Sequence, residues 1–399
     1  MPFHRLWRLD TPLICVSKYL ETVMQRLSFG DEIYSGSSSP SSLPPNSATI
    51  TSNAASAVST FPPIDITEVM IEDTDETTGA AIHNYKVKPL TWYSHHCLPQ
   101  GLQGSTLRVH EFQGRLYVCC GATNDGLPNK AVFHCSVRNL TRWIRADPDV
   151  PQYYSASAIV QGDVVLISGL GAVDGKCTGL LSSYDSKAHV WVQRFPPLPT
   201  PRSSASAFVY SDYLVVIGGQ NDNGDPLNIV EVLHIPTQTW EAASHLPIKV
   251  AGASVVVCGD IAYLVGGYNG TLCLQGVYCA SVRSILASCR RFSIFASLSE
   301  KTISQGIWKQ LHDCPFTKMT ALCSGNQLLA FGGEEVTKAA KSHPAEWIWC
   351  YDSEENTWTP VQGMPSARRL CCVTMLPNNN MVIIGGEPDF CRIDIAEIV

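Results

Sequence analysis

The chain has 399 residues, of which 45% are hydrophobic and only 16% charged, so most of it should fold into a globular core. The net charge of −7 lies almost wholly in residues 1–85, and the near-neutral remainder excludes a basic surface for nucleic acid or anionic lipid. No run of about eighteen apolar residues could form a membrane helix, and no signal peptide is recognisable. We therefore expect a cytoplasmic or nuclear protein with reduced cysteines, sixteen in number.

Residues 1–30 are predicted to contain one short amphipathic helix. Thr11 followed by Pro12 is a typical helix start, and Gly30 can end the helix. Between them, apolar residues recur at steps of three and four. Three roles stay open for this helix: it packs loosely on the globular body or frays, it serves docking or self-association, or it is the remnant of a larger upstream domain.

Residues 31–85 are predicted to be a disordered linker. The stretch 35–60 is rich in Ser and Pro and has almost no large apolar side chains, so it cannot offset the entropy cost of ordering. The stretch 61–73 is acidic and also contains Ile, Val and Met. It is either a solvated linker or a linear motif that folds on a partner.

After residue 90 the sequence repeats with a period of about fifty residues. Apolar runs end in a glycine at intervals of 48, 50, 48, 66 and 53 residues, and tryptophans recur at intervals of 51, 48, 49, 68 and 50. The two series share one period and one long interval, which indicates six structural repeats. The glycines are Gly121, Gly169, Gly219, Gly267, Gly333 and Gly386, and the tryptophans are Trp92, Trp143, Trp191, Trp240, Trp308 and Trp358.

Each repeat is predicted to form four short antiparallel strands. In the third repeat the runs 204–210, 213–217, 228–233 and 239–241 are separated by turn residues. A four-stranded sheet cannot bury both faces alone, so the repeats should stack around an axis. The glycines would permit close approach of backbone or of a large ring, and the tryptophans would fill the gaps between sheets.

These features resemble the kelch-repeat family over residues 86–399. The resemblance includes Gly-Gly after the second strand, the Tyr-Asp pairs at 184–185 and 351–352 before a tryptophan, and Pro-Arg at 201–202. Cys120 and Ser168 replace the first glycine in two repeats, and His234 replaces the usual tyrosine in the third. The resemblance implies an all-β, six-bladed kelch-type β-propeller. The family's usual BTB domain is not expected within residues 1–85.

Two irregularities locate the ring closure and an insertion. The last repeat has no tryptophan strand, whereas Trp92 lies in a strand without a preceding repeat, so an N-terminal strand should complete the sixth blade. Closure of this kind removes exposed sheet edges. The long interval predicts an insert over residues 281–305 in the fourth blade, which is either a tolerated surface excursion or a functional loop.

No catalytic, cofactor-binding or metal site is predicted. His95, His96 and Cys97 are adjacent, but neighbouring strand residues point to opposite faces and no companion pair at zinc spacing exists. Galactose oxidase is built on kelch repeats, so an oxidase-like or sugar-modifying enzyme is the more distant alternative. No residue set here can be assigned to its copper site, and fold alone does not carry function.

The resemblance instead implies a protein-interaction module, scaffold or adaptor. Family members bind peptides on loops that join strands two and three and on loops between blades, and many are ubiquitin-ligase substrate receptors that work with cullin-type ligases. Actin association is the alternative that the family also offers. Arginine and tyrosine on such a rim suit recognition of carboxylates and backbone. The candidate protein-binding residues are Arg145, Tyr153, Arg194, Arg202, Lys249, His312, Arg368 and Arg369.

Overall fold

The computed structural model describes residues 90–398, apart from residues 96, 100–103, 106, 120, 124–130, 147–148, 292–305 and 337–341. All described residues belong to one compact unit. The helix expected in residues 1–30 and the linker expected in residues 31–85 lie outside them. So does the second half of the 281–305 insert.

The described chain folds into six antiparallel blades of four strands each, which run in sequence order from the inside outward except in blade 6, whose outermost strand is β1. Blade 1 consists of β3 (Arg108–Phe112), β4 (Arg115–Cys119), β6 (Val132–Ser136) and β7 (Asn139–Ala146). Blade 2 consists of β9 (Ala156–Val160), β10 (Asp163–Gly171), β11 (Cys177–Asp185) and β12 (Val190–Gln193), with the short β8 (Gln152–Tyr153) pairing β10. Blade 3 consists of β13 (Ser206–Tyr210), β14 (Tyr213–Ile217), β15 (Val230–His234) and β16 (Thr239–Ala242).

The second half of the ring repeats this arrangement. Blade 4 consists of β17 (Ser254–Cys258), β18 (Ile261–Val265), β19 (Val277–Ser281) and β21 (Lys309–Gln310). Blade 5 consists of β22 (Thr320–Ser324), β23 (Gln327–Phe331), β26 (Trp347–Asp352) and β27 (Thr357–Gly363). Blade 6 consists of β28 (Cys372–Met375), β29 (Met381–Ile384), β30 (Ile393–Ile398) and β1 (Leu90–His95).

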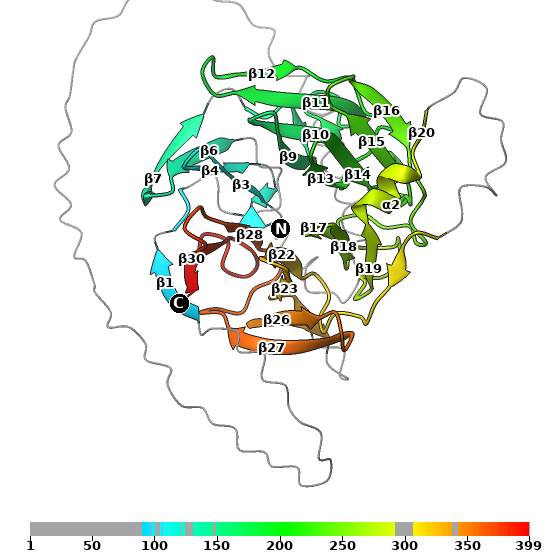
Figure 1. Cartoon of the computed structure of the whole chain (residues 1–399). Helices are drawn as coiled ribbons and strands as arrows, with labels where there is room; N and C mark the ends of the chain where they lie inside the picture. Colours follow the sequence, from blue (N-terminus) through cyan, green and yellow to red (C-terminus); the bar gives the residue numbers. More distant parts are fainter. Residues whose placement is uncertain are drawn as a thin grey trace, which may run out of the picture. The chain divides into compact units, whose positions relative to one another are not determined.

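The blades close into a ring through their innermost strands. The innermost strands of consecutive blades contact one another in the order β3, β9, β13, β17, β22 and β28, and β28 contacts β3 again. Figure 1 shows the blades radiating from this inner ring. The prediction of a six-bladed all-β propeller is confirmed.

The ring is closed by the N-terminal strand. Strand β1 pairs antiparallel with β30, from Leu90 opposite Ile398 to His95 opposite Ile393. Gln362 of blade 5 holds the start of β1: its amide nitrogen donates to the Leu90 carbonyl and its amide oxygen accepts from the Leu90 N–H, both at 2.9 Å. The closure predicted from the unpaired tryptophan strand is confirmed.

Six apolar clusters fill the seams between blades, and each contains one tryptophan of the repeat. Trp143 packs in the cluster between blades 6 and 1, and Trp308 lies in the cluster between blades 3 and 4. The remaining seams contain Trp191, Trp240, Trp358 and Trp92. Large rings supply the apolar area needed where two twisted sheets diverge. The period of the tryptophans is therefore the period of the seams.

The repeated glycines are required by backbone conformation and by close approach. Gly219 has φ +101°, and a Cβ placed on it would lie 2.8 Å from the carbonyl oxygen of Ser203. Gly386 has φ +98° and would meet the Arg369 carbonyl at the same distance. The contact that excludes a side chain is thus with backbone, not with a ring. The other four glycines of the series, Gly121, Gly169, Gly267 and Gly333, also have positive φ.

The first half of the insert is part of the seam between blades 3 and 4. Ser281 leads into α2 (Val282–Ala287), whose Val282 and Ile285 are fully buried in the seam cluster. Strand β20 (Arg290–Arg291) then pairs with β16, the outer strand of the preceding blade. Helix α2 thus anchors the start of the excursion, and β20 covers a sheet edge.

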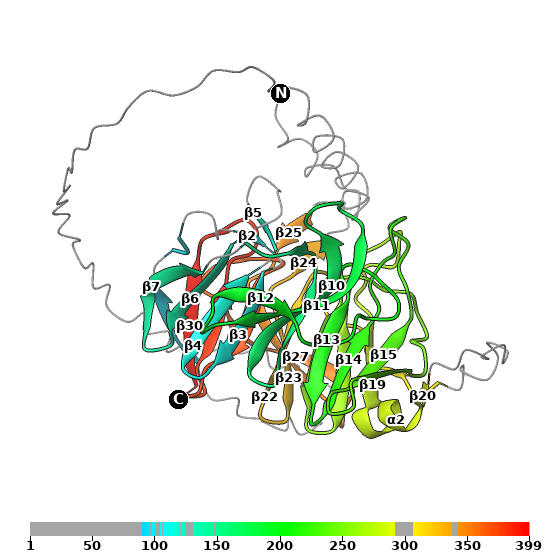
Figure 2. The same cartoon turned by 90° about the horizontal axis from the view of Figure 1, so that it is seen from above.

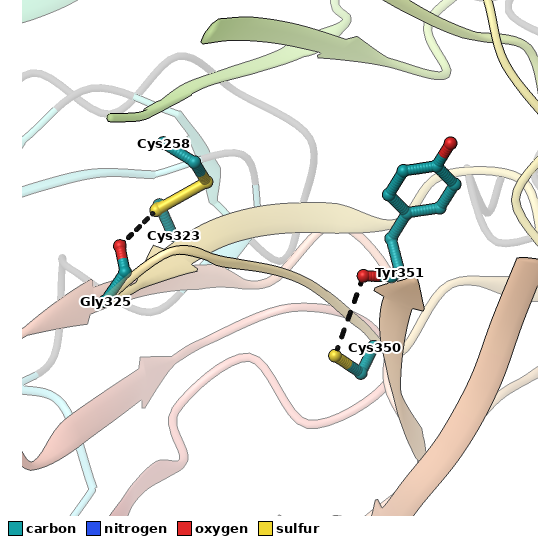
Figure 3. The surroundings of a disulfide bond; sticks show 5 residues. All are labelled: Cys258, Cys323, Gly325, Cys350 and Tyr351. Carbon is teal, nitrogen blue, oxygen red and sulfur yellow. Dashed lines mark hydrogen bonds between the residues drawn. A yellow bond between two sulfur atoms is a disulfide. The ribbon is translucent and has the colours of Figure 1, made fainter. Parts of the chain in front are cut away.

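A disulfide joins the innermost strands of blades 4 and 5. Cys258 at the end of β17 is bonded to Cys323 on β22, with a Cα–Cα distance of 5.5 Å (Figure 3). Neighbouring innermost strands place these residues side by side although they are 65 apart in sequence. The expectation that all cysteines are reduced was wrong for this pair. No helix among the described residues is long and apolar enough to cross a membrane.

Candidate functional site

The strands of each blade are antiparallel, so the connections between them lie alternately on the two faces of the ring. One face, called the loop face here, contains the loops between second and third strands and the connections from one blade to the next. The hairpins β2–β5 (Gly104–Ser105, Ala122–Thr123) and β24–β25 (Glu334–Val336, Ser342–Pro344) belong to it. Figure 2 shows these hairpins on one side of the ring and α2 on the other. The insert therefore starts on the face opposite to the predicted site.

Short β-bridges form the inner rim of the loop face. In each blade the residue after the repeat glycine pairs with a residue just before the innermost strand. The pairs are Ala122 with Ser105, Leu170 with Tyr153, Gln220 with Ser203, Tyr268 with Ala251, Glu334 with Thr317 and Glu387 with Arg369. The rim residues differ from blade to blade while the backbone pairing is constant. The backbone pairing therefore does not require one particular side chain at the rim position.

Blades 5 and 6 carry a charged cluster on this rim. Glu334 is paired with both Lys318 and Arg369, and the Arg369 Nε lies 2.8 Å from Glu387 Oε2. Burial acts to raise the pKa of Glu334, but hydrogen bonds from Lys318 and Ser342 and the charges of Lys318 and Arg369 lower it below its ordinary value. Arg369 thus lies on the predicted face, with its charge already balanced by carboxylates of the protein.

Two of the predicted binding arginines are interior residues. The side chains of Arg202 and Arg368 are completely buried, and they pair with the equally buried Glu231 and Asp394. The backbone carbonyls of both arginines also accept a hydrogen bond from the repeat glycine of the preceding blade. Each arginine therefore ties two blades together. Their placement on a partner-binding rim was wrong, because the position before the bridge residue faces into the blade.

The same interior position holds different groups in other blades. In blade 2 it is Gln152, whose side-chain nitrogen donates to the Ser168 carbonyl at 2.5 Å and whose oxygen accepts from Ser182. In blade 4 it is the buried Val250. In blade 5 it is Phe316, whose ring lies 5.9 Å from that of Trp349, edge to face. Among blades 2 to 6, arginine thus occupies this position only in blades 3 and 6, where a carboxylate of the third strand faces it.

Arg194 also departs from its predicted place. Its guanidinium bonds Asp163 at 2.5 Å and Asp185 at 2.8 Å, and both aspartates lie beside hairpin turns of the opposite face. The long side chain runs along the blade edge toward these carboxylates. Arg194 is therefore not positioned to line the loop face, and its assignment there was wrong.

The remaining candidates do lie at the loop face. Lys249 and His312 are exposed, and Arg145 is exposed and bonds Asp149 at 2.6 Å. Tyr153 is half-buried at the inner rim, and burial together with the charge of Asp149 raises its pKa. These residues are spread over several blades. That they bind a partner stays a prediction.

A shallow groove lies on the loop face of blade 4. Its volume is about 430 Å³. It is lined by residues of the connection before blade 4, of the loop within blade 4 and of the connection after it, among them Lys249, Leu272 and Asp313. Of these, Leu272 has 58% of its surface exposed. The sequence analysis named Lys249 but not the groove. The groove forms only where the connections before and after blade 4 meet the loop between its second and third strands, and the sequence does not show that they meet.

Two further apolar side chains are exposed at loops of the same face. Val173, in the loop between β10 and β11, is 99% exposed, and Trp347, at the start of β26, is 43% exposed. Neither was singled out from the sequence. Single exposed apolar residues are common on protein surfaces, so these two do not by themselves mark a binding site.

The side chain of His95 and the whole of His96 lie outside the described residues. Over the described ranges of the propeller, no group of three or more His, Cys, Asp or Glu residues lies close enough together to hold a metal ion.

Comparison with known proteins supports the repeat assignment. The kelch motif matches residues 201–247 and 315–365, which are blades 3 and 5 with their flanking connections. Kelch-like protein 38 of Rattus norvegicus is 25% identical over 303 residues, covering 74% of this chain and 46% of that protein. Kelch-like protein 40 of Xenopus tropicalis is 25% identical over 137 residues, covering 34% and 22%. The chain thus spans less than half the length of these relatives.

A solved structure agrees on the fold. The structure described as "Structure of YjhT" superposes with a TM-score of 0.59 at 17% identity, covering 75% of this chain and 95% of that one. At this identity the likeness concerns the fold alone. Together with the ring closure and the seam tryptophans, the matched repeats and the relatives support the assignment of this propeller to the kelch-repeat family.

Proposed function

We propose that this propeller is a non-enzymatic protein-interaction module, a scaffold or adaptor, and that it binds an extended peptide segment of a protein partner in the groove of blade 4. The observation that carries the proposal is the groove itself. It combines an exposed apolar side chain, Leu272, with a cation and an anion, Lys249 and Asp313, in one lining.

The size of the groove supports a peptide as the occupant. A volume of about 430 Å³ is at the lower end of what small ligands and side chains occupy, so it accommodates a few side chains and not a folded domain. Binding surfaces commonly place an apolar anchor at the centre and polar groups at the rim. Leu272 would be the anchor, and Lys249 and Asp313 would pair with charges of opposite sign on the partner.

The kelch relatives point to finer versions of this function. Recognition of substrates for a cullin-type ubiquitin ligase is the first, and association with actin is the second. Both use the propeller as a binding surface, so both agree with the groove. A cytoplasmic or nuclear location suits either one.

Affinity purification of the full chain followed by mass spectrometry tests the proposal. For a partner that the parent chain recovers, a Leu272→Asp/Lys249→Glu variant should recover at least tenfold less. Ile144→Asp is the matched control, because Ile144 is 50% exposed but lies on the outer strand β7. Equal recovery by parent and groove variant would overturn the site.

Recovered partners also separate the finer roles. Cullin-ligase components that depend on the groove would support the receptor role. Co-sedimentation with purified filamentous actin, lost in the groove variant and kept in Ile144→Asp, would support the cytoskeletal role. Turnover of a small substrate by the purified chain would overturn the non-enzymatic proposal.

A further inference from the structure

Two cysteines face each other at the point where the ring closes. Strand pairing between β1 and β30 ends with His95 opposite Ile393. Beyond this pair the backbone shifts by one residue from the register of the strands, since the Leu98 N–H donates to the Cys391 carbonyl at 2.6 Å. The two chain segments still run side by side there. The two sulfur atoms are 3.0 Å apart. A disulfide would need the two sulfur atoms to approach to about 2.05 Å, a further movement of about 1 Å.

This pair differs in accessibility from the other thiols. Cys97 is the one exposed free cysteine among the described residues, whereas Cys119, Cys135 and Cys314 are buried in the seams between blades. Cys391 is partly buried, and its Sγ lies 3.5 Å from the Asp389 carboxylate. A thiol at the surface is therefore backed by a second thiol within reach. Such an arrangement is typical of a reactive cysteine with a resolving partner.

We propose that Cys97 and Cys391 form a reversible disulfide that closes the propeller covalently, with a low-molecular-weight disulfide such as oxidised glutathione as the oxidant.

The chemistry proceeds in two exchanges. The exposed Cys97 thiolate attacks one sulfur of the oxidant, so that a mixed disulfide forms and one glutathione thiolate leaves. The Cys391 thiolate then attacks the Cys97 sulfur, which forms the intramolecular bond and releases the second glutathione thiolate. Two protein thiols lose two protons and two electrons, and the oxidant is reduced to two thiols. Excess reduced glutathione reverses both steps.

The order of attack follows from the surroundings of each sulfur. Burial, the neighbouring Cys97 and the carboxylate of Asp389 raise the pKa of Cys391 to about 12. Cys391 is therefore a poor first nucleophile. Once Cys97 is in a mixed disulfide, its own thiol no longer contributes to that shift, and the Cys391 sulfur lies beside the bond that it must attack.

The bond would secure the pairing of β1 with β30, two strands of blade 6 that no hairpin turn connects. Cys97, which follows β1, and Cys391, which precedes β30, are 294 residues apart along the chain. Reduced, β1 is held by strand pairing, by Gln362 and by the seam around Trp92. Oxidised, it cannot leave β30 at the Cys97 end.

The experiment incubates the purified full chain with a series of glutathione redox buffers and maps disulfides by mass spectrometry. We expect peptides containing Cys97 and Cys391 to become linked in oxidising buffer and to separate in reducing buffer. Hydrogen exchange of β1 amides should slow at least tenfold in the oxidised form. Cys97→Ser should abolish the link and the slowing, and Cys177→Ser, a partly exposed thiol elsewhere, should change neither.

Three results would overturn the proposal. Cys97 could remain free and open to alkylation in oxidising buffer, it could stop at a stable mixed disulfide, or it could link to a different cysteine. An unchanged circular dichroism spectrum of Cys97→Ser shows that the variant is folded, so loss of the link is not loss of structure. A failed link leaves the groove proposal unaffected, because the groove lies on blade 4.

Discussion

Arg202 and Glu231 form an ion pair from which solvent is excluded, with 0% and 1% of their side-chain surfaces exposed. The Arg202 carbonyl also receives the N–H of Gly169, so the residue bridges blades 2 and 3. Arg368 and Asp394 repeat the arrangement between blades 5 and 6, half a ring away. Charges buried in this way are held by their partners, and removal of one leaves the other without compensation.

Replacement of Arg202 by alanine should therefore lower the free energy of unfolding by about 3–5 kcal/mol, measured by urea denaturation. Arg145→Ala is the matched control: its pair with Asp149 is about half exposed, so its loss should cost about 0.5 kcal/mol or less. Arg202→Met combined with Glu231→Leu should recover much of the loss, because no charge stays buried. Equal effects of Arg202→Ala and Arg145→Ala would contradict the assignment of Arg202 to the interior.

Gly219→Ala should destabilise the fold by about 2–3 kcal/mol, since the strained φ and the contact with the Ser203 carbonyl act together. Gly114→Ala isolates the first effect. Gly114 also has positive φ, +75°, but a Cβ there would meet nothing within 4 Å, so about 1 kcal/mol is expected. Thermal denaturation of the two variants measures the difference. A smaller loss in Gly219→Ala than in Gly114→Ala would refute the close-approach explanation.

Gln362→Ala should weaken ring closure without changing the rest of the propeller. It removes both hydrogen bonds to the Leu90 backbone, which contribute about 1–2 kcal/mol together. Hydrogen exchange by mass spectrometry should show faster exchange in β1 and β30 and unchanged exchange in blade 3. Gln193→Ala, which removes a side-chain hydrogen bond within blade 2, is the control. Uniform acceleration over all blades would argue against a local clamp.

His110 should make the propeller sensitive to mild acid. Burial and the charge of Arg108 lower the pKa of His110 from 6.5 to about 4, and its Nε2 lies 2.7 Å from Ser157 Oγ. Between these two pH values the unfolded chain binds a proton that the folded chain does not, so the free energy of unfolding falls as pH falls. The loss is complete below pH 4 and amounts to about 3 kcal/mol at most.

His110→Gln provides the comparison, because glutamine can bond Ser157 but does not titrate. The unfolding free energy of parent and variant should be measured from pH 7 to pH 4. As the pH falls, the value for the parent should fall relative to the value for the variant. A difference that is constant with pH would show that His110 does not carry the effect.

The sequence predicted the ring better than the surface. Two marker series with one period sufficed for six blades, and the unpaired strand at Trp92 sufficed for the closure, because both follow from local strand and turn chemistry. Arg202 and Arg368 were misplaced because the same loop holds an inward position and an outward position one residue apart. The β-bridges of Ser203 with Gln220 and of Arg369 with Glu387 show which position of the loop points inward and which points outward.

Contacts between blades were beyond sequence reasoning for a different reason. Cys258 and Cys323 meet because neighbouring innermost strands run side by side, and nothing in their local sequence marks them as a pair. The groove at Lys249 likewise needs a loop of blade 4 and two interblade connections at once. Counting strands in the sequence could predict the ring and its closure, whereas side-chain contacts between neighbouring blades required the structure.

The pairing of Leu90 with Ile398 also determines how the ring would respond to mechanical force. The chain enters β1 and leaves β30 at the same end of the strand pair, so tension between these two points peels the strands apart one residue pair at a time. Peeling loads hydrogen bonds singly and not all together, so the reduced ring should open at low force. A bond between Cys97 and Cys391, at the far end of the pair, would stop the peeling after β1 and leave the other five blades unloaded.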